Sequence, residues 1–133
     1  MRTVNNRSEY LAAVFVVGVA LILLVHFLRD NFHHSPAVGY VLGVAPNLIA
    51  SFSLPVVFIC TKQRIGWLVG PNSNGSWFFG STMLALALVL AWEFRQIHLE
   101  QFVFDPDDIG ASFFGAILFL CCWPMVRRFM SSA

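Results

Sequence analysis

Four long apolar segments, separated by short polar stretches, make up most of the chain. They run from Tyr10 to Leu28, from Ala37 to Cys60, from Ser76 to Ile97 and from Asp105 to Val126. Each is close to the ~20 residues that an α-helix needs to cross the hydrocarbon core of a bilayer. The last three show no alternation with a period of two, which membrane β-strands of ~10 residues would have. The pattern predicts an all-α polytopic membrane protein, a bundle of four transmembrane helices in a single integral membrane domain over residues 1–133.

The composition also indicates a lipid environment. Of the 133 residues, 58% are hydrophobic and 11% are charged, whereas soluble domains have roughly 45–50% and 25%. The first segment is expected to be a retained helix, because its apolar run exceeds the 7–15 residues of a signal peptide. The formal net charge of +1 and the lack of a basic cluster argue against nucleic-acid binding. Cys60, Cys121 and Cys122 lie in apolar segments, which favours small buried side chains over disulfides or metal ligands.

Basic residues in the short connections predict the orientation of the helices. Six of the eight Lys and Arg residues belong to the N-terminus, the second connection and the C-terminus: Arg2, Arg7, Lys62, Arg64, Arg127 and Arg128. Arg29 and Arg95 fall on the opposite side. The positive-inside rule then places both termini in the cytoplasm, in a protein integral to the cytoplasmic membrane. In this orientation most carboxylates and all the histidines, His26, His33, His34 and His98, lie at the outer face.

Three aspartates mark the start of the fourth segment. Asp105 is expected to be the N-cap of a helix and Pro106 its first helical residue. Asp107 and Asp108 then lie in the first turn, where the helix dipole favours anions. Capping accounts for one carboxylate but not for three. Continuing along the segment, Asp105, Asp108, Ser112 and Gly115 fall within a sector about 80° wide on one face of the helix.

A second polar stripe ends the third segment. Glu93, Gln96 and Glu100 follow helical spacing and are expected at the same membrane depth as the aspartates. Glu93 lies inside the apolar run, where a carboxylate costs on the order of 2.5–3.5 kcal/mol at the bilayer centre. Such a residue usually faces the interior of the bundle or a wet cavity. The alternative is a solvated position at headgroup depth.

Two prolines interrupt the second segment. Pro46 and Pro55 each remove the hydrogen-bond donor of the carbonyl four residues earlier. Asn47 lies beside the first of these openings and is a candidate site residue. In the alternative interpretation, Ser51 and Ser53 satisfy the freed carbonyls of an ordinary kinked helix. Small residues of this segment are expected to allow close packing of helices: Gly39, Gly43, Ala45 and Ala50.

The motif Glu93-x-x-Gln96, then Asp105-x-x-Asp108-x-x-x-Ser112-x-x-Gly115, resembles the C-terminal half of VanZ-like membrane proteins, a family named for a teicoplanin-resistance protein. The family pattern is E-x-x-Q, then D-x-x-D-x-x-x-N-x-x-G, so Ser112 stands where the family usually has Asn. The family's early Asp-Lys and His motif is not recognisable, and the match covers under a quarter of the chain. The resemblance implies a small polytopic protein. Some family members are linked to tolerance of lipoglycopeptide antibiotics, and their biochemical activity is poorly defined.

Three classes of function compete. In the first, an acidic polar cleft at the outer membrane face binds an amphiphile, a cationic ligand or a cell-envelope component through Asn47, Glu93, Gln96, Asp105, Asp108, Ser112 and Gly115. In the second, the chain is a structural or accessory subunit of a larger assembly, as a homo- or hetero-oligomer in contact with membrane lipid. The third is an enzyme acting on a lipid-linked substrate, with Glu93 or Asp108 as acid or base. The sequence contains no nucleophile–base pair and no metal-ligand motif, so enzymatic activity is disfavoured and neither a metal nor another cofactor is expected.

Overall fold

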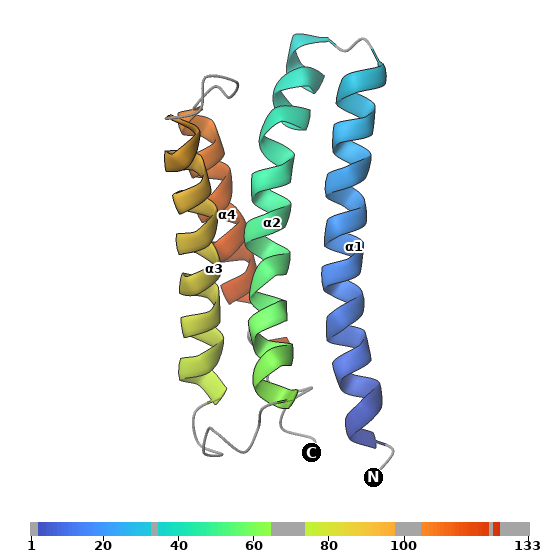
Figure 1. Cartoon of the computed structure of the whole chain (residues 1–133), viewed down its shortest axis with the longest axis vertical. Helices are drawn as coiled ribbons and strands as arrows, with labels where there is room; N and C mark the ends of the chain where they lie inside the picture. The colour runs from blue at the N-terminus through green and yellow to red at the C-terminus, as the bar shows by residue number, and fades with distance from the viewer. Residues whose placement is uncertain (1–2, 33–34, 65–73, 98–104, 123, 126–133) are drawn as a thin grey trace.

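The described part of the chain folds into four α-helices, each antiparallel to the next (Figure 1). The computed structural model describes residues 3–32, 35–64, 74–97, 105–122 and 124–125. The helices are α1 (Thr3–Asn31), α2 (Pro36–Arg64), α3 (Asn74–Gln96) and α4 (Pro106–Cys121). We call the end of the bundle where α1 ends and α2 begins the α1–α2 end; α3 ends and α4 begins there as well. The predicted all-α class and four-helix arrangement are confirmed for this part of the chain.

Three of the helices are long and apolar enough to cross a membrane. These spans are Ala13–Asn31, Pro36–Thr61 and Gly75–Gln96, with 19, 26 and 22 residues. The described part of α4 has 16 residues, about 24 Å at 1.5 Å per residue, and its predicted continuation to Val126 reaches beyond the described residues. Large apolar side chains cover the outside of the bundle, among them Val16, Leu23, Phe79, Leu88, Phe114 and Ile117. A surface of this kind suits lipid rather than water, so the chain is a membrane protein.

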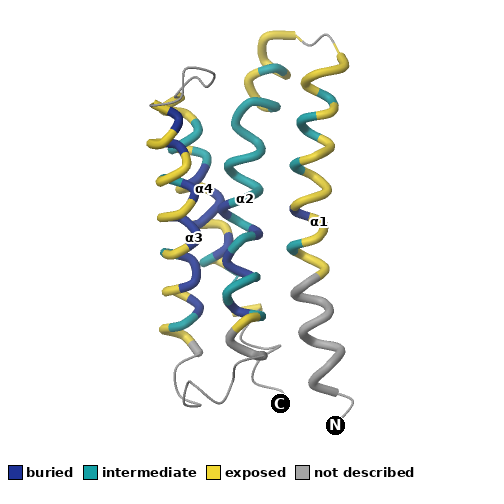
Figure 2. The backbone as a smooth tube through the Cα atoms, in the orientation of Figure 1, coloured by how far each residue is buried: buried dark blue, intermediate teal, exposed yellow. Residues whose placement is uncertain are grey.

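The helix α2 is the centre of the bundle. It packs against each of the other three helices, and α3 and α4 also pack against each other. α1 packs mainly on α2 and is exposed along most of its described length (Figure 2). Gly18 is buried at this contact, where an added Cβ would come within 2.6 Å of the Ser53 side chain. A Cβ at Gly39 or Gly43 would meet nothing within 4 Å, so the expectation that these two glycines allow close packing is wrong.

An apolar core joins α2, α3 and α4 far from the α1–α2 end. It consists of Val56, Ile59, Phe78 and Phe119. The ring of Phe119 stacks on Phe78 with a centroid distance of 4.9 Å, and it meets Phe52 edge-on at 5.7 Å. Aromatic pairs of this geometry add stability beyond the area that they bury. The core therefore fixes three helices relative to one another, and with them the side chains at the opposite end of the bundle.

The helix α2 continues unbroken through Pro46 and Pro55. The hydroxyl of Ser53 donates to the carbonyl of Ile49 at 2.8 Å, and the hydroxyl of Ser51 is buried without a hydrogen-bond partner. Neither serine occupies a carbonyl that the prolines free, so the alternative in which they do is wrong. α2 instead carries a buried polar atom, Ser51 Oγ, into the interior of the bundle.

Candidate functional site

The helix α4 begins as the sequence predicts. Asp105 has an extended backbone, with φ −120° and ψ 119°, and its carboxylate accepts a hydrogen bond from the Asp107 N–H at 2.9 Å. Pro106 is the first helical residue. Both predictions are confirmed. Asp105 thus serves as a cap, and its carboxylate is committed to the backbone at the start of α4.

The side chain of Glu93 lies inside the bundle. Glu93 is 1% exposed. Its Oε1 accepts hydrogen bonds from the amide groups of Asn47 on α2 and Gln96 on α3, each at 3.0 Å. Its Oε2 is buried and has no hydrogen-bond partner. The alternative of a solvated carboxylate at headgroup depth is therefore wrong.

Asp108 brings a second carboxylate to the same place. Its carboxylate is half-buried, and it is near enough to Glu93 for the two negative charges to repel. We call Asn47, Glu93, Gln96 and Asp108 the Glu93 cluster. Because α2, α3 and α4 each contribute to it, the cluster forms only when all three helices are packed.

Among the described residues, the basic side chains nearest to the Glu93 cluster form no ion pair with it. Arg95 follows Glu93 by two positions, but its guanidinium lies over the ring of Trp92, 5.7 Å from the centroid. Arg29, at the end of α1, acts on Asp108 through its charge, and its Nε lies 3.8 Å from the carboxylate of Asp30. The buried carboxylate thus keeps an unpaired oxygen beside a second anion.

The carboxylates become less exposed from the α1–α2 end inward. Asp105 and Asp107 are exposed, Asp108 is half-buried and Glu93 is buried. Tyr40 of α2 is exposed at the same end of the bundle, near the charge of Asp107. A positively charged group approaching from this end would meet acidic side chains at each step toward Glu93.

A close contact between α4 and α2 positions the first turn of α4. Gly115 is buried, and a Cβ added to it would clash with the backbone carbonyl of Leu48 and lie 3.1 Å from Ser51 Cβ. Ser112 is also buried, and its hydroxyl donates to the Asp108 carbonyl at 2.8 Å. Gly115 therefore lets α4 lie closely against α2, while the Ser112 hydroxyl bonds to the backbone of Asp108 within α4.

The Glu93 cluster presents acceptors without matching donors. The N–H groups of Asn47 and Gln96 point to Glu93 Oε1. Of the acceptors in the cluster, Glu93 Oε2 is the one that is buried and has no hydrogen-bond partner among the described residues. A buried charge without a partner is costly, so a positively charged donor is the group that completes this arrangement.

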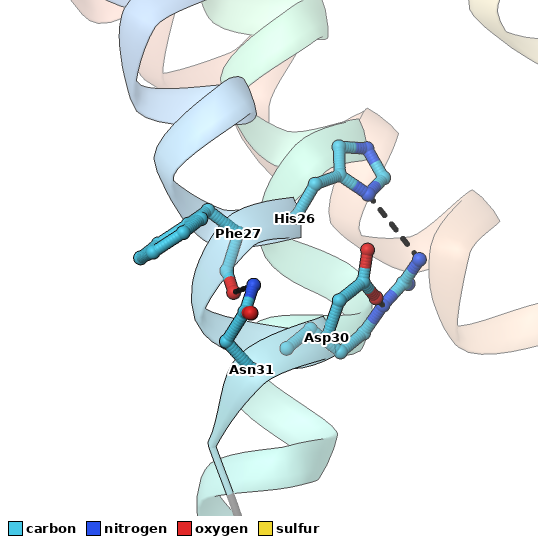
Figure 3. Close-up of polar contacts among 5 residues, drawn as sticks. His26, Phe27, Asp30 and Asn31 are labelled. Atoms are coloured by element: carbon cyan, nitrogen blue, oxygen red, sulfur yellow. Dashed lines mark hydrogen bonds and ion pairs between the residues drawn. The ribbon is translucent and has the colours of Figure 1, made fainter.

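No metal centre is evident in the described part of the chain, where no three His, Cys, Asp or Glu side chains converge. His26 lies on α1, and its Nδ1 is 3.2 Å from Arg29 Nη2 (Figure 3). The other three histidines and Glu100 lie outside the described residues. Of the polar stripe predicted at the end of the third apolar segment, the structure therefore describes Glu93 and Gln96.

Sequence reasoning missed two residues on α2 that line the same face as Asn47. Tyr40 approaches Asp107, and Ser51 carries the unpartnered hydroxyl near Gly115. The sequence does contain a signal for these residues. Positions 40, 47 and 51 are spaced by 7 and 4 residues, which places them on one face of a helix. Asn47 was predicted as a site residue because it lies beside Pro46. In the structure its side-chain amide donates a hydrogen bond to Glu93 Oε1.

The chain is similar to a stretch of one much longer protein. It is 30% identical over 100 residues to the calpain-type cysteine protease ADL1 of Oryza sativa subsp. japonica, and the match covers 72% of this chain and 4% of that protein. The chain thus spans a small fraction of the relative's length. No protein-family model matches the chain. No solved structure matches it either.

Proposed function

We propose that this chain is a small VanZ-like protein of the cytoplasmic membrane that binds the cationic group of an amphiphile or of a cell-envelope component at the Glu93 cluster. The observation that carries the proposal is the unpartnered Oε2 of a carboxylate that is 1% exposed. Carboxylates buried within membrane helices usually serve binding or transport, because their burial is otherwise costly. In this proposal α4 is the fourth span.

The orientation is part of the same proposal. With six of the eight basic residues on one side, both termini are cytoplasmic. The beginning of α1 and the end of α4 point toward the same end of the bundle (Figure 1), which agrees with an even number of spans. The Glu93 cluster then opens to the outer membrane face, where an amphiphile can reach it from the outer leaflet.

The residues that carry the VanZ resemblance act as one unit in this proposal. Glu93, Gln96 and Asp108 belong to the Glu93 cluster. Asp105 caps the helix that carries Asp108, Ser112 bonds to the Asp108 carbonyl within that helix, and Gly115 lets the helix pack closely on α2. A motif of six residues with three such distinct but joined roles supports a shared function rather than a chance match.

The proposal is tested by binding of two cationic amphiphiles with the same tail, dodecylammonium and dodecyltrimethylammonium. The full chain is reconstituted in phosphatidylcholine nanodiscs and titrated in a calorimeter, with empty nanodiscs subtracted. We expect saturable binding of at least one probe. Glu93→Gln and Asp108→Asn, which keep the shape of the side chains, are expected to weaken binding at least tenfold. Saturable binding of neither probe, or equal binding to Glu93→Gln, contradicts the proposal.

A second candidate is a structural or accessory module of a larger membrane assembly. It is favoured by the match of 72% of this chain to 4% of a longer protein, which indicates that such a bundle occurs as one part of a large chain. Cross-linking in native membranes tests it: a cross-linked product larger than the chain that persists in Glu93→Gln supports the module. The protease activity named for that relative is not proposed for this chain, whose three cysteines lie in or at the ends of apolar helices.

A further inference from the structure

The unmatched groups of the Glu93 cluster specify the shape of a donor. Glu93 Oε2 is buried and unpartnered, and Asp108 lies beside it at half exposure. A primary ammonium group carries a positive charge and three N–H donors on one small centre. It can donate to Glu93 Oε2 and to the Asp108 carboxylate at the same time, and its charge offsets theirs.

Quaternary ammonium groups are recognised by different surroundings. They have no N–H donor, and proteins bind them with the faces of aromatic rings. Trp92 and Phe94 flank Glu93 in the sequence but lie on the outside of α3, with exposures of 46% and 54%. The rings of Phe52, Phe78 and Phe119 pack together in the apolar region at the other end of the bundle. These five rings therefore do not enclose the Glu93 cluster.

A bare metal ion fits the Glu93 cluster less well than an ammonium group does. Calcium takes six to eight oxygen ligands, and magnesium requires six in octahedral geometry. Only two carboxylates meet in the Glu93 cluster, and in the described residues no third acidic, histidine or cysteine side chain joins such a group. One oxygen of Glu93 is already held by two amide donors, which reduces the ligands left for a metal.

The surroundings of the cluster suit a ligand with an apolar tail. Phe94 of α3, Ile97 directly after α3 and Phe113 of α4 are exposed apolar side chains near the α1–α2 end. A headgroup that passes the half-buried Asp108 to reach Glu93 would leave its tail along this apolar surface, in contact with lipid. The ligand class is thus an amphiphile with a small, donor-rich cationic head.

From these observations we infer that the Glu93 cluster is specific for a primary ammonium group on an amphiphile. The inference rests on the proposed function and narrows it to one ligand chemistry. Two sources share this chemistry: the amine headgroup of an aminophospholipid and a free long-chain amine. Glu93 Oε2 and the Asp108 carboxylate accept N–H groups of the ammonium.

The test compares dodecylammonium with dodecyltrimethylammonium on the reconstituted full chain. We expect dodecylammonium to bind at least tenfold more tightly than the quaternary probe, and we expect this preference to disappear in Glu93→Gln. Equal or tighter binding of dodecyltrimethylammonium overturns the ammonium inference while the proposed function stands. Saturable binding of neither probe overturns both.

A matched control removes a carboxylate from the same end of the molecule without touching the cluster. Asp30 lies at the end of α1, its side chain is exposed, and its nearest ion pair is with Arg29 at 3.8 Å (Figure 3). Asp30→Asn changes the net charge by the same amount as Asp108→Asn. We expect Asp30→Asn to keep the tenfold preference. If Asp30→Asn and Asp108→Asn reduce binding equally, the effect is bulk electrostatic attraction and the inference is wrong.

Two further experiments identify the source of the ammonium group and test whether the Glu93 cluster binds a bare metal ion instead. Native mass spectrometry of the chain purified from membranes reports bound lipid: retained phosphatidylethanolamine in excess of phosphatidylcholine assigns the site to a lipid headgroup. Dodecylammonium binding without retained phosphatidylethanolamine assigns it to a free amine. Calcium chloride or sodium chloride is then titrated in the absence of amphiphile. Metal binding that is tighter than dodecylammonium binding and is lost in Glu93→Gln overturns the inference in favour of a bare cation.

Discussion

The two oxygens of Glu93 have opposite environments within one side chain. Oε1 accepts two hydrogen bonds at 3.0 Å, and Oε2 accepts none although it is buried. The first oxygen holds Asn47 and Gln96 in place, while the second carries charge that no neighbour offsets. A residue of this kind stabilises its surroundings through one atom and destabilises them through the other, so different substitutions are expected to have opposite effects.

Glu93→Gln is expected to leave the stability of the free protein unchanged or to raise it. The substitution keeps an oxygen for the two amides and replaces the charged, unpartnered oxygen by an N–H₂ group that can donate to Asp108. Glu93→Ala removes the acceptor and is expected to cost about 2 kcal/mol or more, because buried amides lose their partner and a void is left. Thermal unfolding of both variants in detergent, followed by tryptophan fluorescence, measures the difference. Equal losses for Gln and Ala would show that the charge of Glu93 is compensated in the free protein.

Two glycines on α4 allow the effect of helix packing on stability to be distinguished from the effect of helix propensity. Gly110 and Gly115 lie on the same helix, but a Cβ at Gly110 would meet nothing within 4 Å, while one at Gly115 would strike the Leu48 carbonyl. The obstacle at Gly115 is backbone, which cannot rotate away as a side chain can. The fit between α4 and α2, and with it the position of Asp108, depends on the missing Cβ at one of the two glycines.

Gly110→Ala and Gly115→Ala are therefore expected to differ in sign. Alanine at Gly110 should stabilise α4 by roughly 0.5–1 kcal/mol, since glycine is a poor helix former. Alanine at Gly115 should destabilise the bundle by about 1–3 kcal/mol, as overpacking does, and weaken ligand binding by displacing Asp108. Unfolding temperature and dodecylammonium affinity are measured for both. A Gly115→Ala protein with the stability and affinity of Gly110→Ala would disprove the close contact.

The start of α4 gives a second prediction for this element. Asp105→Ala removes the side-chain acceptor of the Asp107 N–H and should cost about 1 kcal/mol of local stability. Asp107→Asn keeps that N–H and should cost less. Hydrogen exchange of the first-turn amides of α4 reports the change directly. Faster exchange in Asp107→Asn than in Asp105→Ala would contradict the assignment of Asp105 as the cap.

At the scale of the whole molecule, α2 joins the remaining helices. α2, α3 and α4 share the apolar core and the Glu93 cluster, whereas α1 adds a peripheral contact at Gly18 and Ser53. The two ends of α2 are accordingly different. The first end, near the end of α1, has the exposed residues Ser35 and Pro36. The second end lies beyond the apolar core and has the exposed residue Thr61. These positions suit a test of orientation.

Single cysteines at Ser35 and Thr61, in a chain with its three native cysteines replaced, are expected to label from opposite sides of the membrane. A membrane-impermeant maleimide added to intact cells should modify the cysteine at position 35. The cysteine at position 61 should react only after permeabilisation. The reverse pattern would place the termini outside and the Glu93 cluster at the inner face, and it would contradict the proposed orientation.

Much of the fold follows from local signals in the sequence. Apolar runs of membrane-spanning length predicted the four helices, and Asp105 with Pro106 predicted the start of α4 to the residue. Helical spacing also predicted that Glu93, Gln96 and Asp108 lie on facing stripes. These predictions succeed because the start of a helix and the face on which a residue lies depend on residues one or two turns away in the same helix.

Contacts between helices were not predictable in the same way. The Asn47–Glu93 hydrogen bond joins residues 46 positions apart, and nothing local to Asn47 indicates its partner. Gly39 and Gly43 were expected to allow close packing, yet Gly18 and Gly115 do so. A glycine has the same local character wherever it lies, so only the relative rotation and register of two helices decide which one meets a neighbouring backbone.

The division of the Glu93 cluster among three helices has a consequence for biosynthesis. α3 leaves the ribosome before α4, so Glu93 enters the membrane when Asp108, Gly115 and Phe119 have not yet been made. Until α4 arrives, Asn47 and Gln96 are the groups available to Glu93, and the aromatic core lacks the ring that joins Phe52 to Phe78. A chain truncated before α4 therefore retains an incompletely packed carboxylate within its span. The Glu93 cluster and the aromatic core are therefore completed by the same event, the packing of α4 against α2 and α3.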